Sequence, residues 1–561
     1  MNNQKVIKKQ LSLILTAFLF CTTNMVLGYQ QQDTTVVQVF TFDDPSPEGW
    51  GASYKGKAKF PTTDKQWGKI LMIQRLKCDE RTKGDKFPCG EWDYFTNTVI
   101  KVPKGDTVEA FEIGSFITPY GKRLELGGEE GWRWVYDLTD YAPILKGELE
   151  ISSGNNLELL DLKFLFIEGI PDRDVLSVEN IYPIGDYNYG KLADDSVLQS
   201  KKMVLNADAN AYKLKARISG HGHYGPRNCC EWDSKVHSYF INRRRMFNWN
   251  VWKDCGYNPI FPQGGTWQFN RAGWCPGTKV DEHDFELSNW VEPGDTVMID
   301  YAIEPYADNG EKGGDFRMSH QLISYGSPNF KNDASIHDII APSEEDTYGR
   351  ENPTCGDASI VIKNAGSHQL RSLEIHYGLR NGKKSVYQWR GNLTFLEKEE
   401  VWLPAPEWKD IDTDNVFEVV VKNPNGQKDE RASNNRLTSK VLPVPILPNQ
   451  FQLKIDAVGL GRAKENGYFL SNNSGKVLFY REELADNQVY EDMIKLDNGC
   501  YELLITDKHE DGMIRHWWNR GRNPDLVGEN GNIQILDKKG TVLHTLKYDF
   551  ADKLIFRFRV K

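Results

Sequence analysis

The chain has 561 residues, of which 39% are hydrophobic and 26% charged, and its formal net charge is −10. These fractions are typical of a folded globular chain, and an acidic chain lacks the basic face that a nucleic-acid binder needs to neutralise phosphates. At roughly 150 residues per domain, the length predicts three or four domains.

Residues 1–28 predict a secretory signal peptide. Lysines within the first nine residues precede an apolar run at 11–20, and Gly28 is a small residue at the expected cleavage site. The apolar run is too short to span a bilayer. We therefore expect a secreted, periplasmic or cell-surface protein without a membrane span.

From residue 29 to about residue 330, short alternating or β-branched runs dominate the sequence. Examples are 69–74, 95–102 and 157–169, and clusters of Gly, Pro, Asn and Asp separate such runs. Helical periodicity is hard to find. Strands at this spacing predict an all-β chain of β-sandwiches or jelly rolls.

The C-terminal part continues the strand pattern. Residues 350–441 predict a compact immunoglobulin-like β-sandwich, residues 442–448 a stiff linker with three prolines, and residues 449–561 a last β domain. We expect both domains to dock to glycoprotein, cell surface or secretion machinery. In the last domain, Asp507 and Asp511 predict an acidic turn, with calcium binding through oxygen ligands as the alternative.

Two segments share a local pattern that carries the chemistry. One reads Cys-Gly-Glu-Trp-Asp at 89–93, and the other reads Cys-Cys-Glu-Trp-Asp at 229–233. Either an internal duplication has left a common corner in two domains, or the two loops face each other and build one site. In an extended Glu-Trp-Asp segment the two carboxylates point to one side and the Trp to the other.

Two further groups of residues lie near the second copy. His221 and His223, with His237 later, form a possible metal-ligand pattern, which would suit a copper-dependent monooxygenase built on two jelly rolls. The run 270–277 places Arg271 near Trp274 in a turn that contains Cys275. Arginine is suited to bidentate contact with carboxylates.

The sequence resembles the bacterial peptide-N-glycosidase F family, whose members are secreted amidases with two jelly-roll domains. The matching segments cover about residues 35–328 in the same order: TFDD at 41–44, Cys78 to Asp93, FEIGSFITPYG at 111–121, ISGHGH at 218–223, CCEW at 229–232, CGYNPI at 255–260 and NRAGWCPG at 270–277. The resemblance implies two adjacent eight-stranded jelly rolls at 29–185 and 186–330. It also implies a bacterial enzyme that uses no cofactor or metal.

The family's functional positions carry over by motif. The catalytic acids would be Asp93, Glu231 and, through an alignment that needs a gap, Glu168. The substrate-binding residues would be Glu91, Trp92, Trp232, Arg271 and Trp274. The disulfides implied are Cys78–Cys89 and Cys255–Cys275, which leaves Cys229, Cys230, Cys355 and Cys500 unassigned.

The implied reaction is hydrolysis of the amide that joins an Asn side chain to the innermost N-acetylglucosamine of an N-linked glycan. An amide needs a base to activate water and a proton for the departing nitrogen. We expect Asp93 to activate the water, Glu231 and Glu168 to hold the sugar and a second water, and Arg271 to hold a glutamate. The expected partners are N-glycosylated proteins and glycopeptides, bound by a monomer. The alternatives are the copper monooxygenase and a non-catalytic glycan-binding protein.

Overall fold

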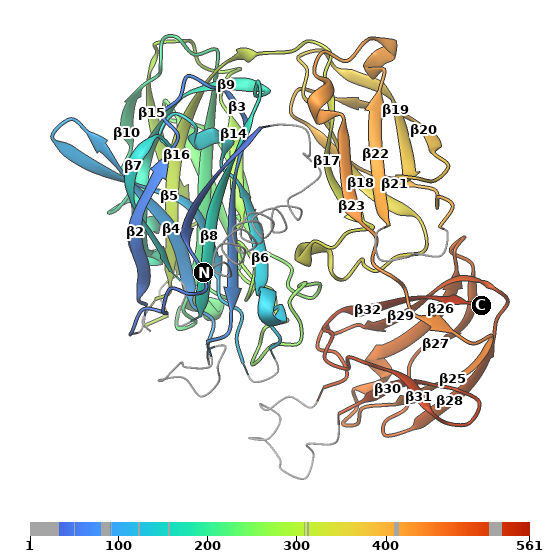
Figure 1. Cartoon of the computed structure of the whole chain (residues 1–561). Coiled ribbons are helices and arrows are strands. Elements are labelled where there is room, and N and C mark those ends of the chain that lie inside the picture. Colours follow the sequence, from blue (N-terminus) through green and yellow to red (C-terminus); the bar gives the residue numbers. More distant parts are fainter. Residues whose placement is uncertain are drawn as a thin grey trace, which may run out of the picture. The chain divides into compact units, whose positions relative to one another are not determined.

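The computed structural model describes residues 33–49, 51–79, 90, 92–121, 124–154, 158–307, 309–310, 313–408, 415–514 and 530–561. The expected signal peptide lies outside these residues. The regular structure is almost entirely β, which confirms the predicted fold class (Figure 1). The described chain forms two compact units: one holds 330–344 and 357–443, and the other holds 33–329, 345–356 and 444–561.

The first part of the larger unit is a jelly roll of two four-stranded sheets. One sheet has the order β1-β8-β3-β6 and the other β2-β7-β4-β5, which is jelly-roll connectivity. The strands are β1 (Thr34–Phe40), β2 (Ser53–Phe60), β3 (Trp67–Lys77), β4 (Phe95–Lys104), β5 (Thr107–Ile117), β6 (Trp132–Asp137), β7 (Gly147–Gly154) and β8 (Leu159–Glu168).

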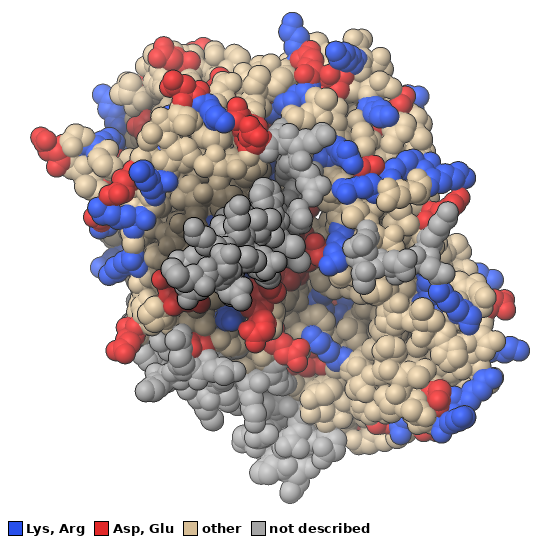
Figure 2. All heavy atoms as spheres, viewed as in Figure 1, with Lys and Arg blue, Asp and Glu red and all other residues tan. Residues whose placement is uncertain are grey.

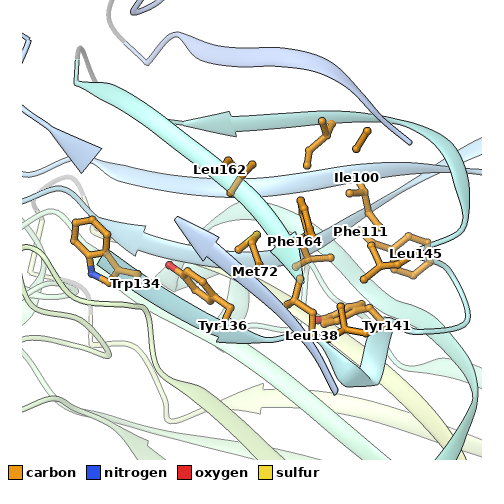
Figure 3. Close-up of a cluster of buried hydrophobic side chains, with 14 of the residues drawn as sticks. Met72, Ile100, Phe111, Trp134, Tyr136, Leu138, Tyr141, Leu145, Leu162 and Phe164 are labelled. Atoms are coloured by element: carbon orange, nitrogen blue, oxygen red, sulfur yellow. The ribbon is translucent and has the colours of Figure 1, made fainter. Parts of the chain in front are cut away.

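Alternation along the strands builds the core of this jelly roll. In the first half of β8, Leu160, Leu162 and Phe164 are fully buried, while Asp161 and Lys163 between them are only half-buried. This period of two is what a strand with one face on the core requires. Figure 3 shows Leu162 and Phe164 beside Met72 and Ile100, which belong to one buried cluster.

The second jelly roll follows directly. Its sheets have the orders β10-β15-β12-β13 and β14-β11-β16-β9. The elements are β9 (Arg173–Asn188), α2 (Tyr189–Ala193), β10 (Lys201–Val204), β11 (Ala211–His221), β12 (Lys235–Ile241), β13 (Arg244–Val251), β14 (Glu282–Glu286), β15 (Thr296–Ile303) and β16 (Asp315–Pro328).

Backbone and charged contacts join the two jelly rolls. The Ile117 N–H donates to Thr278 O at 3.1 Å, and Gly277 N–H donates to Ile117 O at 2.8 Å. Farther along, Arg217 is 3% exposed and donates to Glu282 and to the Tyr141 hydroxyl, each through a nitrogen–oxygen distance of 2.8 Å. These bonds satisfy the buried polar groups of the interface, so the two jelly rolls meet in a defined register.

The smaller unit, for which the sequence predicts an immunoglobulin-like domain, is a β-sandwich with sheets β17-β18-β21 and β20-β19-β22-β23. Its first strand starts at Ala334, before the boundary at residue 350 that the sequence suggested, and residues 345–356 belong to the larger unit. The strands are β17 (Ala334–Ala341), β18 (Ala358–Asn364), β19 (Leu370–Leu379), β20 (Ser385–Leu393), β21 (Lys398–Leu403), β22 (Val416–Lys422) and β23 (Arg436–Lys440).

The C-terminal β domain completes the larger unit with sheets β24-β32-β29-β26-β27 and β28-β25-β30-β31. The proline-rich segment 442–448 contains β24, which lies at a sheet edge, where a proline that cannot donate a hydrogen bond is tolerated. The strands are β24 (Ile446–Leu447), β25 (Gln450–Asp456), β26 (Asn466–Asn472), β27 (Val477–Arg481), β28 (Val489–Lys495), β29 (Gly499–Asp507), β30 (Asn532–Leu536), β31 (Val542–Leu546) and β32 (Lys553–Val560).

Helical structure is sparse. Within the described residues, no helix is both long and apolar enough to cross a bilayer. On the face shown in Figure 2, basic and acidic side chains are interspersed. The short 3-10 helices are η1 (Gly128–Glu130), η2 (Thr139–Tyr141), η3 (Pro226–Asn228), η4 (Asp346–Tyr348), η5 (Pro424–Gly426), η6 (Ala432–Asn434) and η7 (Ala463–Glu465).

Candidate active site

Asp93 lies in the first jelly roll, just before β4. The turn that follows β5 holds this segment in place: Tyr94 N–H donates to Thr118 Oγ1 at 3.0 Å, and Thr118 N–H donates to Tyr94 O at 2.9 Å. Because Thr118 sits where β5 meets the second jelly roll, Asp93 is placed at the junction of the two domains.

Glu231 comes from the second jelly roll, and its backbone is fixed on both sides. Its N–H donates to Gly222 O at 2.9 Å, and its carbonyl accepts from Ala272 N–H at 3.0 Å. A side chain at Gly220 would put its Cβ 1.9 Å from Cys230 O, so the missing side chain lets the backbone of β11 approach the segment that carries Glu231.

Arg271 joins the two acids. Its side chain is fully buried, its Nε donates to Glu231 Oε1 at 3.1 Å, and its Nη2 lies 3.7 Å from Asp93 Oδ2. The same guanidinium donates to Phe269 O at 2.7 Å and to Thr266 Oγ1 at 3.1 Å. The planar fork of arginine can satisfy several acceptors at once, and here it holds carboxylates from both jelly rolls close together.

Aromatic rings cover the guanidinium. The Arg271 Cζ lies 4.2 Å from the Trp232 ring centroid and 4.8 Å from that of Trp274. Trp274 is 2% exposed and donates its indole N–H to Gly220 O at 2.8 Å, while Trp92 is 57% exposed. Flat rings with different exposure at one charged site suit a ligand that is polar at one end and presents a flat apolar face at the other.

Burial and charge set the protonation of the pair. Burial raises the pKa of Glu231, Arg271 lowers it, and Asp93 raises it; the net result is a pKa of about 7. Burial also raises the pKa of Asp93, against the opposing effect of Arg271. Two carboxyl groups that share one counter-ion in a buried place hold a proton between them near neutral pH. The site therefore offers an acid and a base side by side.

Comparisons with known proteins show the family of this chain. A family model described as the C-terminal domain of peptide-N-glycosidase F matches residues 188–323. The chain is 30% identical over 306 residues to the peptide-N(4)-(N-acetyl-beta-D-glucosaminyl)asparagine amidase F of Elizabethkingia miricola, and the match covers 50% of this chain and 81% of that protein. The chain belongs to the peptide-N-glycosidase F family. The resemblance of the sequence and the enzyme class it implied are thereby confirmed.

Solved structures of the peptide-N-glycosidase F family are also similar to this chain. One is the glycosylasparaginase PNGase F from Flavobacterium meningosepticum, at 27% identity, with 52% of this chain and 96% of that chain covered and a TM-score of 0.45. Another is a peptide-N(4)-(N-acetyl-beta-D-glucosaminyl)asparagine amidase, at 26% identity, with 53% and 97% covered and a TM-score of 0.44.

One acid carried over from the peptide-N-glycosidase F family does not reach the site. Glu168 ends β8, where its backbone pairs with Trp67 and its carboxylate bonds to Lys65 Nζ at 2.5 Å. The opposite end of β8 begins at Leu159, shortly after β7 ends at Gly154. Because Gly154 packs on Thr96 at the start of β4, this end of β8 is the one that lies toward Asp93. At about 3.3 Å per residue, β8 separates Glu168 from that end by roughly 30 Å. The expected clustering of Glu168 with Asp93 is therefore corrected.

The histidines of the copper alternative do not converge. His221 stacks on Trp274, with ring centroids 5.4 Å apart, and His223 stacks on the neighbouring Tyr224. His237 lies in the core of the second jelly roll, with Nδ1 2.6 Å from the Tyr301 hydroxyl. The geometry thus does not favour the monooxygenase.

In the described part of the chain, one group of side chains has the ligand spacing of a metal site. It comprises Glu465, Asp507 and Asp511, whose ligand atoms lie within 4.8 Å of one another. Arg462 forms an ion pair with Asp511, and Asn466 donates to Asp507 at 2.6 Å, so protein groups already contact these acids. The cluster lies in the C-terminal β domain and not at the Asp93 site.

The cysteines pair as follows. Cys255 and Cys275 are joined, as the family resemblance implied. Cys78 is disulfide-bonded, and its expected partner Cys89 lies outside the described residues, as does Glu91. The residues left unassigned by the sequence form the pairs Cys229–Cys230 and Cys355–Cys500.

Sequence reasoning missed Tyr120 and Thr266, which hold the Arg271 side chain in place. Tyr120 is 5% exposed, and its hydroxyl accepts from Thr266 N–H at 3.1 Å. Thr266 and Phe269 in turn accept from the guanidinium. The Tyr-Gly turn at 120–121 was part of the resemblance, but no local pattern marked Thr266, because its role depends on contacts across the two jelly rolls.

Proposed function

We propose that this chain is an amidase that cleaves N-linked glycans from peptides and glycoproteins at the Asn side chain. The observation that supports it most is the pair of partly exposed acids, Asp93 and Glu231, which come from different jelly rolls and share the buried Arg271. Family membership gives the reaction class, and this pair gives it a base and an acid.

In the proposed reaction, Asp93 takes a proton from a water molecule as the water oxygen attacks the amide carbonyl. The bond between the carbonyl carbon and the glycosylated nitrogen then breaks, and protonated Glu231 donates to the departing nitrogen. The peptide keeps an Asp, and the glycan leaves as a glycosylamine that later loses ammonia. The pKa of Glu231, raised to about 7, lets this carboxyl hold a proton near neutral pH.

The main role that we assign to Arg271 is to position the two acids, not to transfer a proton. It is fully buried and bonded to Thr266, Phe269 and Glu231, so it keeps the acids in one geometry without a change of side-chain conformation during the reaction. We assign Trp92 and Trp232 to contacts with the proximal sugars, because aromatic faces stack on the apolar faces of sugar rings. Trp274, also expected to bind substrate, is buried against Arg271 and His221, so we assign it to holding the guanidinium.

We further propose that the enzyme works outside the cytosol as a monomer and without a cofactor. The disulfides Cys229–Cys230, Cys255–Cys275 and Cys355–Cys500 suit an oxidising compartment. A chelator such as EDTA should leave the rate of glycan release unchanged, and a chelator-sensitive rate would return the metal alternative to consideration.

The direct test is product analysis of a purified N-glycopeptide in heavy-oxygen water. The proposal predicts free glycan and a peptide in which Asn has become Asp carrying one heavy oxygen. Binding of the glycopeptide with no mass change would favour the non-catalytic glycan-binding alternative. Release of the glycan with N-acetylglucosamine left on Asn would assign a glycosidase reaction instead.

A further inference from the structure

Two segments outside the jelly rolls contact the loop that carries Arg271. We call residues 345–356 the strap, residues 547–553 the C-terminal turn and residues 254–271 the Arg271 loop. All three belong to the larger compact unit. The strap is also tied to the C-terminal β domain by the disulfide Cys355–Cys500.

Arg350 in the strap bonds to both partners at once. Its side chain is 7% exposed; Nε donates to Asn258 O at 2.7 Å, and Nη1 donates to Phe550 O at 2.9 Å and to Lys553 O at 2.8 Å. Its Cζ lies 3.9 Å from the Phe261 ring centroid. Through these three hydrogen bonds from Nε and Nη1, the buried guanidinium links the C-terminal turn to the Arg271 loop.

The C-terminal turn adds direct contacts. Asp552 N–H donates to Gly256 O at 3.2 Å, and Lys547 Nζ donates to Phe261 O at 2.8 Å. Ala551 is fully buried in one cluster with Trp267 and Tyr120. The turn thus contacts the Arg271 loop near its start and at Trp267.

From Trp267 the contacts continue to the reacting groups. The next residue toward the N-terminus, Thr266, is held by the Tyr120 hydroxyl and accepts from Arg271 Nη2 at 3.1 Å. Because the fully buried Trp267 shares one cluster with Tyr120 and Ala551, a shift of the C-terminal turn would move Thr266 and with it the guanidinium.

We propose that Arg350 and Ala551 are positioning residues for the amidase reaction, through which the C-terminal β domain holds Arg271 against Asp93 and Glu231. This rests on the proposed function. It gives the domain a part in catalysis in place of the docking role that its sequence suggested. Neither residue contacts the reacting atoms; both act through the Arg271 loop.

The test compares full-length Arg350→Gln with Arg481→Gln. Arg481 lies in β27 of the C-terminal β domain, within the same compact unit as the strap, and pairs with Asp492, so it controls for the loss of a bonded arginine away from the Arg271 loop. We expect hydrogen exchange across 255–271 to speed up in Arg350→Gln and kcat to fall about tenfold to a hundredfold with a smaller change in KM. The high-pH limb of its rate profile should move to higher pH. A guanidinium that is less well held lowers the pKa of Glu231 less.

Ala551→Gly keeps the proposal falsifiable if Arg350→Gln does not fold. Ala551 has φ 59°, a conformation that glycine adopts without cost, so this change removes only a methyl group from the buried cluster that contains Trp267 and Tyr120. Faster hydrogen exchange across 255–271, a lower kcat and a shifted pH profile in Ala551→Gly, each smaller than in Arg350→Gln, would support the proposal. An exchange rate in Arg350→Lys close to that of the wild type would support it further. Exchange and pH profile equal to those of Arg481→Gln would overturn the proposal. A wild type that releases no glycan would instead overturn the proposed function, since the exchange measurement does not depend on activity.

Discussion

Glu231 shows how two opposed effects set the chemistry of one residue. Burial disfavours its charge, and Arg271 at 3.1 Å favours it; burial is the larger effect, so the pKa rises to about 7. Removing Arg271 would therefore leave both acids protonated over a wider pH range. The guanidinium keeps the pair within reach of physiological pH.

The first prediction concerns the pH dependence of the rate. As the pH rises through about 7, Glu231 loses the proton that the departing nitrogen needs, so kcat/KM for a glycopeptide should fall. In Glu231→Gln the side chain cannot donate a proton, and we expect kcat to fall by about 10²–10⁴-fold and this limb to vanish. A limb that persists unchanged in the variant would assign the titration to another group.

The sequence predicted part of this site. The repeated Cys-x-Glu-Trp-Asp pattern marked the two loops, and the resemblance to the peptide-N-glycosidase F family singled out Asp93 and Glu231 within them. Glu168 was expected beside Asp93 and does not lie there, because a residue's position in a strand does not show which end of the strand faces the site. Thr266 and Tyr120 could not be found, since they meet only when the two jelly rolls are in register.

Among the elements, the inner faces of β12 and β16 carry buried histidines. His237 and His320 are both fully buried, with their Nδ1 atoms at the hydroxyls of Tyr301 and Tyr239. Burial lowers the pKa of each well below the ordinary value. The folded second jelly roll therefore holds them neutral, while the unfolded chain protonates them below about pH 6.5.

It follows that the second jelly roll should lose stability as the pH falls through about 6.5, because the unfolded state then binds protons that the folded state does not. His237→Gln removes one such group and should make the fall of Tm with decreasing pH less steep, whatever its effect on Tm at pH 8. His368→Gln, at an exposed position of the smaller unit, is the control and should leave the slope unchanged. Equal slopes in all three proteins would refute this explanation.

The sequence was most informative for single strands. Short alternating or β-branched runs marked β3, β4 and β8, and the three prolines of 442–448 correctly kept that segment out of a sheet centre. It was least informative for the strap, because Arg350 and Cys355 find their partners more than a hundred residues away. Such contacts leave no local pattern in the sequence.

At the scale of the whole molecule, a disulfide closes a long loop. Cys355 and Cys500 are 145 residues apart in sequence, and they tie the strap to the C-terminal β domain. In the chain-entropy model, a cross-link of this span stabilises the folded state by about 5 kcal/mol. Replacing both cysteines by serine should lower the Tm of the larger unit by several degrees in calorimetry. An unchanged Tm would mean that the strap is held by its other contacts alone.

The main proposal is that Asp93 acts as the catalytic base of an amidase whose active site takes residues from both jelly rolls. Its most direct test is the rate of heavy-oxygen incorporation into the new Asp of a glycopeptide, compared between wild type, Asp93→Asn and Asp233→Asn. Asp233 closes the second copy of the motif but pairs with Arg227 at 2.9 Å, outside the Arg271 group, so it is the matched control. We predict a loss of about 10²–10⁴-fold in Asp93→Asn alone, with unchanged Tm and glycopeptide binding. A turnover of Asp93→Asn close to that of wild type would contradict the account.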